Sequence, residues 1–276
     1  MIQHTRRRLV LTATAGVTAL TLASCGSDGD VAGTDGTDGA QSGEIELISE
    51  GKLTTCTHLP YKPFQFTEGG EIVGFDVDIV DEIAADLGVE QEIIDTPFEG
   101  IQSGEDLNTL KCDIAAAGMT ITDVREENLD FSDPYFDATQ ALLVPADSDV
   151  TSLEDLSGGK LAVQLATTGE IYAQENAPDD VELVQFEDLA LLQTAVQTGQ
   201  VDAAINDNGV LLDFAAENDD VKVAAEFDTG EQYGLGVRTG NEALLEQVNA
   251  TLERIREDGT YDEIYERWFG EAPGQS

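Results

Sequence analysis

The stretch CDIAAAGMTITDVREENLDFSDPYF, residues 112–136, contains the pattern from which the fold and a binding site can be derived. It opens with a short apolar run at Asp113–Ala116, which predicts a buried β-strand. The residues GMTIT (118–122) follow and are small or carry hydroxyl groups, so their backbone and side chains can approach a ligand closely.

Arg125 follows this loop and is the only Lys or Arg between Lys111 and Lys160. Its guanidinium offers a planar donor fork that fits a carboxylate in two parallel hydrogen bonds. The alternative is an exposed arginine that forms a surface ion pair. The acidic residues available for such a pair are Glu126, Glu127 and Asp130.

Around this stretch, strand-like and helix-like patterns alternate, which predicts an α/β architecture with largely parallel sheets. We expect strands at Leu53–Thr57, Val89–Ile94, Asp113–Ala116, Ala141–Val144, Leu161–Gln164, Val181–Gln185, Val201–Ile205, Val221–Ala224 and Gly234–Val237. Two helix faces are expected, one formed by Ile79, Val80, Ile83, Ala84 and Leu87, the other by Leu244, Val248, Leu252 and Ile255.

The alternation pauses at 134–139 and at 228–232. If both pauses are crossings between lobes, residues 140–230 form a second lobe that is inserted into the first. The first lobe then consists of residues 44–137 and 234–272. Two connecting strands would form a hinge, with a cleft between the lobes where ligands of α/β proteins tend to bind.

The N-terminal residues 1–24 have the features of a signal peptide: arginines at 6–8, then the apolar run Leu9–Ala23. The run ends in Leu-Ala-Ser-Cys at Cys25, which resembles a lipobox and predicts lipidation of that cysteine. An ordinary signal peptide that contains a cysteine is the alternative. Residues 25–43 are Gly, Ser, Thr, Asp and Ala with little to bury, and predict a flexible acidic linker.

The chain has 13 basic and 56 acidic residues, a formal net charge of −43. This charge excludes nucleic acid as a partner because phosphate would be repelled. It is also the composition expected of proteins that stay soluble at high salt. The aspartates at 28, 30, 35 and 38 match no calcium-binding loop, and we expect neither a metal nor a cofactor.

Cys56 and Cys112 are the other cysteines. In an exported protein, which folds in an oxidising compartment, they predict an intramolecular disulfide. Two buried free thiols are the alternative.

The sequence GFDVDI at 74–79, followed by Ile83, Ala84 and Leu87, resembles a signature of the family 3 extracellular solute-binding proteins. GMTITDVREENLDFSDPYF is similar to a second block of this family, and the resemblance covers residues 50–270. It implies a two-lobe periplasmic-binding-protein fold of type II. It also implies that the chain is a polar-amino-acid receptor of an ABC importer.

By this resemblance, Arg125 holds the ligand α-carboxylate and the Thr120 hydroxyl supports it. The Gly118 carbonyl accepts from the α-ammonium, which also pairs with Asp207 of the second lobe. Both charges of a zwitterion must be paired when it leaves water. Asp207 precedes Asn-Gly, so a turn residue is the alternative reading.

The resemblance also assigns Thr167 and Thr168 to a loop that binds the carboxylate at the start of a helix. A helix cap is the alternative for Thr168. Tyr61 and Phe98 are assigned to aromatic walls around the aliphatic part of the ligand, and ordinary core aromatics are the alternative.

Two residues depart from the family pattern. His58 stands where several members have an acid that contacts the ligand side chain, and Gln164 where some have lysine. The missing acid argues against a lysine or arginine ligand and favours one like glutamine or glutamate. The negative charge of the whole chain acts in the opposite sense by attracting cations.

The resemblance therefore predicts a monomeric, lipid-anchored receptor that is not an enzyme and that delivers an amino acid to an ABC permease. We place it at the outer face of the cytoplasmic membrane or in the periplasm. A cyclohexadienyl or arogenate dehydratase-like enzyme on the same fold is one alternative, and its chemistry needs a cleft acid for proton transfer. A sensor domain that signals to a membrane partner is another.

Overall fold

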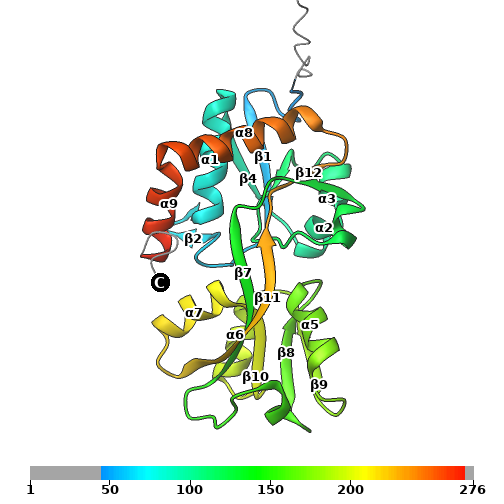
Figure 1. Cartoon of the computed structure of the whole chain (residues 1–276), viewed down its shortest axis with the longest axis vertical. Helices are drawn as coiled ribbons and strands as arrows, with labels where there is room; N and C mark the ends of the chain where they lie inside the picture. The colour runs from blue at the N-terminus through cyan, green and yellow to red at the C-terminus, as the bar shows by residue number, and fades with distance from the viewer. Residues whose placement is uncertain (1–44, 271–276) are drawn as a thin grey trace, which may run out of the picture. The chain divides into compact units, whose positions relative to one another are not determined.

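The structure is a computed structural model that describes residues 45–270. The predicted signal peptide, Cys25 and the linker lie outside the described residues. Two five-stranded sheets, each flanked by helices, form two lobes (Figure 1). A small hairpin, β2 (Phe66–Glu68) and β3 (Glu71–Val73), adjoins the first lobe.

The first sheet has the order β4-β1-β5-β12-β6. Its strands are β1 (Lys52–Thr57), β4 (Glu90–Asp95), β5 (Ile114–Ala115), β6 (Leu129–Phe131) and β12 (Gly236–Arg238). The helices that belong to this lobe are α1 (Phe75–Leu87), α2 (Phe98–Gln102), α3 (Glu105–Asn108), α4 (Asp123–Glu126), α8 (Glu242–Asp258) and α9 (Thr260–Phe269).

The second sheet has the order β11-β7-β10-β8-β9. Its strands are β7 (Phe136–Pro145), β8 (Lys160–Gln164), β9 (Glu182–Phe186), β10 (Ala203–Asp207) and β11 (Val221–Tyr233). Its helices are α5 (Thr168–Asn176), α6 (Leu189–Gln197) and α7 (Asn208–Glu217), with a 3₁₀ turn at Leu153–Leu156. All nine predicted strands are therefore present, and most ends agree within two residues. However, β7 begins five residues before its predicted start and β11 ends nine residues beyond its predicted end.

Each sheet is mixed: four of its five strands run in the same direction, as the prediction of mostly parallel sheets requires, and one strand is reversed. In the first, β1 pairs in parallel with β4 and β5, whereas β12 pairs antiparallel with β5 and β6. In the second, β8 pairs in parallel with β9 and β10, whereas β7 pairs antiparallel with β10 and β11. The reversed strands are β7, which itself passes between the lobes, and β12, which follows β11, the second strand that passes between them. No crossover helix precedes either strand, so antiparallel pairing is open to them.

The two predicted pauses lie inside or beside long strands. β7 begins at Phe136, and β11 continues through 228–232 to Tyr233 with shifts in register against β7. The two strands run side by side between the two groups of helices (Figure 1). Polar residues and Gly230 alternate with few apolar residues in this part of β11, so the sequence is typical of a loop. In the structure Gly230 has a φ of 63°. The exact lobe boundaries at 137–140 and 230–234 stay a prediction.

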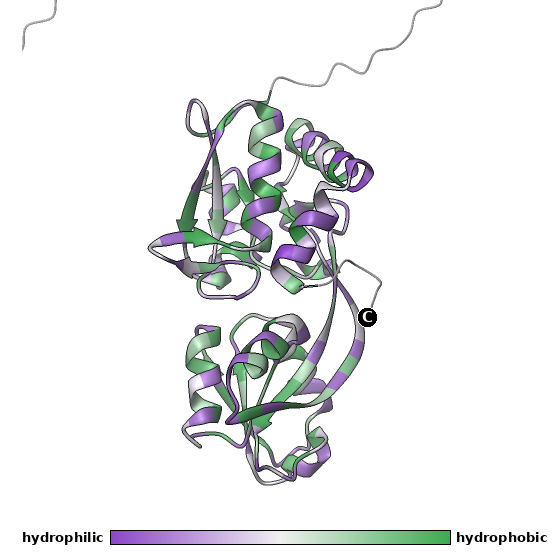
Figure 2. Ribbon diagram, turned by 90° about the vertical axis from the view of Figure 1, so that its left-hand side faces the viewer, coloured by the Kyte–Doolittle hydropathy of each residue, from purple (hydrophilic) through white to green (hydrophobic). Residues whose placement is uncertain are grey.

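The apolar residues gather on the strands and on the inner faces of the helices (Figure 2). The predicted face of α1 is buried at Ile79, Val80, Ile83 and Ala84, and that of α8 at all four predicted positions. Gly74 ends the hairpin before α1 with a φ of 144°, where a Cβ would lie 2.1 Å from the Phe64 carbonyl oxygen. Only glycine allows the GFDVDI helix to start this close to the Phe64 backbone.

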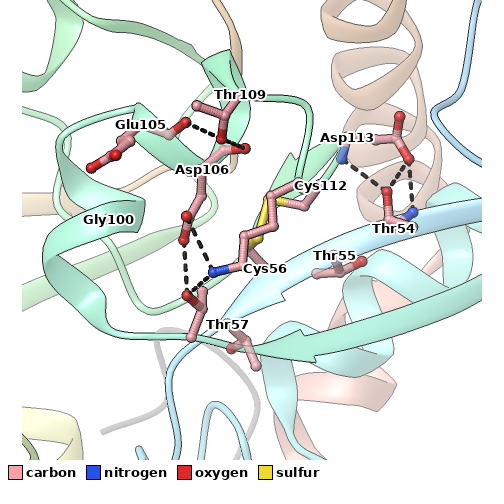
Figure 3. Close-up of a disulfide and its surroundings, with 12 residues drawn as sticks. Thr54, Thr55, Cys56, Thr57, Gly100, Glu105, Asp106, Thr109, Cys112 and Asp113 are labelled. Carbon is pink, nitrogen blue, oxygen red and sulfur yellow. Dashed lines mark hydrogen bonds and ion pairs between the residues drawn. A yellow bond between two sulfur atoms is a disulfide. The ribbon is translucent and has the colours of Figure 1, made fainter.

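The predicted disulfide is present and joins Cys56 of β1 to Cys112, just before β5 (Figure 3). Next to it, Asp113 accepts a hydrogen bond of 2.9 Å from the Thr54 backbone, and its own N–H donates to Thr54 Oγ1 at 3.1 Å. The disulfide packs in a cluster of buried apolar residues that includes Phe98 and Ala117. It therefore lies directly behind one wall of the cavity described next.

Candidate ligand-binding site

A narrow cavity with a free volume of about 20 Å³ lies between the two lobes. It is lined by all ten residues that the sequence analysis selected, together with Gln65 and Ala117. From the first lobe come His58, Tyr61, Phe98, Gly118, Thr120 and Arg125; from the second come Gln164, Thr167, Thr168 and Asp207.

Arg125 lies on the short helix α4 and is only 5% exposed. Its Nη1 donates to the Thr120 carbonyl at 2.7 Å and its Nη2 to the Ala166 carbonyl of the second lobe at 3.1 Å. It forms no ion pair with a described residue, so the surface ion pair considered above is wrong. Burial lowers the pKa of Arg125, while the charges of Asp207 and Glu231 act in the opposite sense. A buried guanidinium with only carbonyl partners is energetically unfavourable unless an anion joins it.

Asp207 ends β10 at the point where α7 begins, and it is also 5% exposed. Its Oδ2 accepts from Tyr61 of the first lobe at 2.8 Å and from Tyr233 of β11, and Oδ1 accepts from Gln140. Its side chain makes no cap hydrogen bond to α7, so the residue is more than a turn former. Burial is the main cause that raises the pKa of Asp207 to about 6, with a further rise from the charge of Glu231 and opposing hydrogen bonds.

Gly118 has a φ of 54°, and a Cβ there would lie 2.8 Å from the Tyr61 ring. Its N–H donates to Oδ2 of Asp76 at 2.8 Å, while Tyr135 donates to Oδ1 of the same carboxylate at 2.8 Å. Asp76 is fully buried in the first turn of α1, and burial raises its pKa to about 7. This acid fixes the backbone of the GMTIT loop from behind and turns the Gly118 peptide into a defined orientation.

The hydroxyl residues of the second lobe start α5. Thr167, not Thr168, is the N-cap: its hydroxyl accepts from the Glu170 N–H at 3.1 Å. Thr168 is the first helical residue, which corrects the alternative reading of Thr168 as a cap. Its hydroxyl donates to Oε2 of Glu231 at 2.8 Å, as does that of Thr120 at 2.9 Å.

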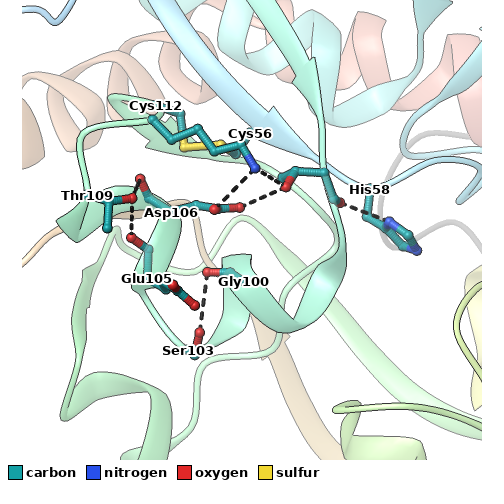
Figure 4. A network of polar contacts seen from close by, with 10 residues as sticks. Cys56, His58, Gly100, Ser103, Glu105, Asp106, Thr109 and Cys112 are labelled. Carbon is teal, nitrogen blue, oxygen red and sulfur yellow. Dashed lines mark hydrogen bonds and ion pairs between the residues drawn. A yellow bond between two sulfur atoms is a disulfide. The ribbon is translucent and has the colours of Figure 1, made fainter.

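His58 and Gln164 line the cavity but are engaged by other protein groups. His58 Nδ1 lies 3.0 Å from the Thr96 carbonyl (Figure 4). Its Nε2 lies 3.3 Å from the Glu187 carbonyl. A neutral imidazole has one N–H and can donate to only one of the two. Gln164 accepts from Asn206 at 3.1 Å through its side-chain oxygen.

The two aromatic residues differ in their surroundings. The Phe98 ring lies under the Arg125 guanidinium, 5.3 Å from the ring centroid, so it holds the cation in place as well as lining the cavity. The Tyr61 hydroxyl reaches across to Asn206 and Asp207 and connects the lobes.

Sequence reasoning missed several residues at the site. Asp76 could have been found, because it shares a helix face with Val80, Ile83 and Leu87, and an acid on a buried face calls for a reason. Gln65, buried with its side-chain oxygen unpaired, and Glu231 of the long β11 gave no such signal.

The two mixed sheets, the two connecting strands, and a buried cation and acid from opposite lobes around one cavity define a two-lobe binding protein of the periplasmic type. The chain matches the bacterial extracellular solute-binding proteins, family 3, over residues 53–271, and it belongs to that family. Membership of an extracellular family implies that the chain is exported.

The relatives are amino-acid-binding proteins. The ABC transporter glutamine-binding protein GlnH of Bacillus subtilis (strain 168) is 38% identical over 211 residues, 75% of this chain and 76% of that protein. An ancestral arginine-binding protein solved with glutamine bound is 42% identical, with a TM-score of 0.77 over 81% of this chain and 100% of that one. The ancestral amino-acid-binding protein AncCDT-1, a precursor of cyclohexadienyl dehydratase, is 39% identical, with a TM-score of 0.73 over 79% and 95%. Further relatives are named for histidine, cystine and arginine.

Within residues 45–270, no helix is long and apolar enough to cross a membrane. The same residues contain no cluster of His, Cys, Asp or Glu arranged to hold a metal ion.

Proposed function

We propose that this protein is the amino-acid-binding receptor of an ABC importer, and that Arg125 and Asp207 clamp the two charges of the ligand in the cavity between the lobes. One observation carries the proposal: a buried guanidinium and a buried carboxylate line the same cavity, and neither forms an ion pair with a described residue. A zwitterion supplies an anion for Arg125 and a cation for Asp207 at once.

The clamp would act only when the lobes are together, because Arg125 belongs to the first lobe and Asp207 to the second. A ligand that pairs with both therefore has a higher affinity for the closed state than for an open one. The Gly118 carbonyl and the Thr120 hydroxyl also belong to the first lobe and the Thr168 hydroxyl to the second, so they too can bind one ligand together only when the lobes are closed. Occupancy and closure are coupled in this way, which gives a permease a signal of loading.

A polar L-amino acid like glutamine or glutamate fits best the part of the cavity that is expected to contact the ligand side chain, which is lined by Gln65, His58 and Gln164. Gln65 offers a buried, unpaired amide oxygen there, and His58 and Gln164 can donate or accept. No carboxylate stands at position 58 to pair with a lysine or arginine side chain.

A thermal-shift screen of the purified protein against the twenty amino acids and cystine tests the function. A ligand at about one hundred times its Kd stabilises the folded state by roughly 2.7 kcal/mol, which is a clear rise in Tm. We expect a shift with a small set of polar amino acids, glutamine among them. A flat screen at millimolar concentration would contradict the proposal.

The affinity is expected to fall as the pH decreases through about 6. Asp207 must be charged to pair with an ammonium, and burial raises its pKa to about 6. An adjacent ammonium favours the charged form, so binding releases a proton wherever Asp207 is protonated. Isothermal titration at pH 5 and pH 8 measures this; equal affinities, with no proton release at pH 5, would count against Asp207 as the ammonium partner.

We place the protein as a monomer outside the cytoplasmic membrane, anchored through a lipid on Cys25, with an ABC permease as its partner. The ligand is released unchanged, which separates a receptor from the dehydratase-like alternative. Mass spectrometry of the ligand after prolonged incubation distinguishes the two.

A further inference from the structure

Glu231 joins the two lobes beside the cavity although no sequence pattern pointed to it. It lies on β11, next to the point where the three residues between Phe227 and Glu231 stand against one residue of β7, Thr139. Bulges of this kind redirect a side chain. The Glu231 carboxylate accepts from Thr120 Oγ1 of the first lobe at 2.9 Å and from Thr168 Oγ1 of the second at 2.8 Å, both at Oε2. The side-chain nitrogen of Gln140 lies 3.2 Å from both of its oxygens.

These contacts use the donors that the clamp requires. A threonine hydroxyl has one proton to donate. While Thr120 and Thr168 donate to Glu231, they present only lone pairs to the cavity and cannot donate to a ligand carboxylate.

The charges lead to the same conclusion. Glu231 forms no ion pair with a described residue, and its charge acts on both Arg125 and Asp207. A zwitterion would satisfy Arg125 and Asp207 and leave the charge of Glu231 unpaired. A ligand carboxylate at the two hydroxyls would also lie next to a second carboxylate, which is unfavourable.

We propose that Glu231 is a built-in competitor of the ligand: its carboxylate holds the Thr120 and Thr168 hydroxyls in the ligand-free protein, and the carboxylate of the bound amino acid displaces it. The inference rests on the proposed function and extends it. Glu231 is partly exposed, so its side chain can turn toward solvent when the hydroxyls change partner. The residue then lowers the affinity for amino acids and holds the empty lobes together through the same two threonines.

The test compares Glu231→Gln and Glu231→Ala with the wild type by isothermal titration of L-glutamine and L-arginine. Glu226→Gln is the matched control, because Glu226 lies on the same strand, is exposed, and contacts Asn208 instead of a threonine. We expect both Glu231 variants to bind the amino acid roughly tenfold tighter, the size expected when competition from a hydrogen bond to a charged group is removed. The control should bind like the wild type.

The α-carboxamides of the same amino acids separate competition from a general effect of charge or stability. Their amide oxygen still accepts from the two hydroxyls but carries no negative charge for Glu231 to repel, so they should show a smaller gain than the amino acids in either variant. Unchanged or weaker amino-acid binding in the Glu231 variants, or an equal gain for the carboxamides, would overturn the inference while the receptor function stands. If the wild type and Glu226→Gln bind neither these two amino acids nor any other in the thermal-shift screen, the proposed function fails and the inference with it.

Discussion

Arg125→Ala is expected to abolish amino-acid binding while the ligand-free protein stays folded. Loss of one partner of a buried charge pair costs about 3–5 kcal/mol, a reduction in affinity of a few hundred-fold to a few thousand-fold. The stability of the ligand-free protein should change little, because Arg125 is desolvated there and has only two carbonyl partners. Isothermal titration and thermal unfolding measure the two effects separately.

Arg254→Ala is the matched control. Arg254 pairs with Glu82, Asp86 and Asp258 on the surface of α1 and α8, far in sequence from every residue of the cavity. Its loss should lower Tm slightly and leave the affinity intact. Arg125→Lys tests geometry as well, since lysine keeps the charge but loses the planar fork. Retention of wild-type affinity in Arg125→Ala would rule out the clamp.

The Cys56→Ala/Cys112→Ala double variant is expected to lose about 4 kcal/mol of stability by the chain-entropy estimate. The two cysteines are 56 residues apart in sequence. The disulfide is buried among the residues behind Phe98 and Ala117, so weaker ligand binding should accompany the loss. At about 2–4 °C for each kcal/mol in a domain of this size, Tm should fall by roughly 8–16 °C, measured by circular dichroism.

Reduction of the wild-type protein provides the control for that variant. A thiol reductant should lower the Tm of the wild type toward that of the double variant and leave the variant itself unchanged. The expected fall in Tm is several times larger than 2 °C. A double variant whose Tm lies within about 2 °C of that of the wild type would therefore contradict the stabilising role of the disulfide.

The fold could be predicted largely from local patterns. The strands around β1, β5 and β8 and the inner faces of α1 and α8 follow from apolar spacing, because each buries a face of its own. The mixed character of the sheets did not follow. Strand direction depends on how the chain returns from the other lobe, and no local pattern records that path.

The site could be predicted only where a residue type or the family motif marked it. All ten selected residues line one cavity, whereas Asp76, Gln65 and Glu231 were missed. Glu231 stands in a polar, glycine-containing segment that reads as a loop, and it reaches the threonines only because β11 bulges against β7. A contact of this kind arises from tertiary structure, where a threonine 111 residues away becomes a neighbour.

The central claim is that one guanidinium and one acid hold opposite ends of the same small molecule. A crystal structure of the protein with the amino acid found by the thermal-shift screen tests it most directly. The account predicts the ligand carboxylate within hydrogen-bonding distance of the Arg125 guanidinium, and the ligand ammonium within the same distance of the Asp207 carboxylate. A bound amino acid that leaves Arg125 on the Thr120 and Ala166 carbonyls alone, or that occupies another part of the protein, would contradict it.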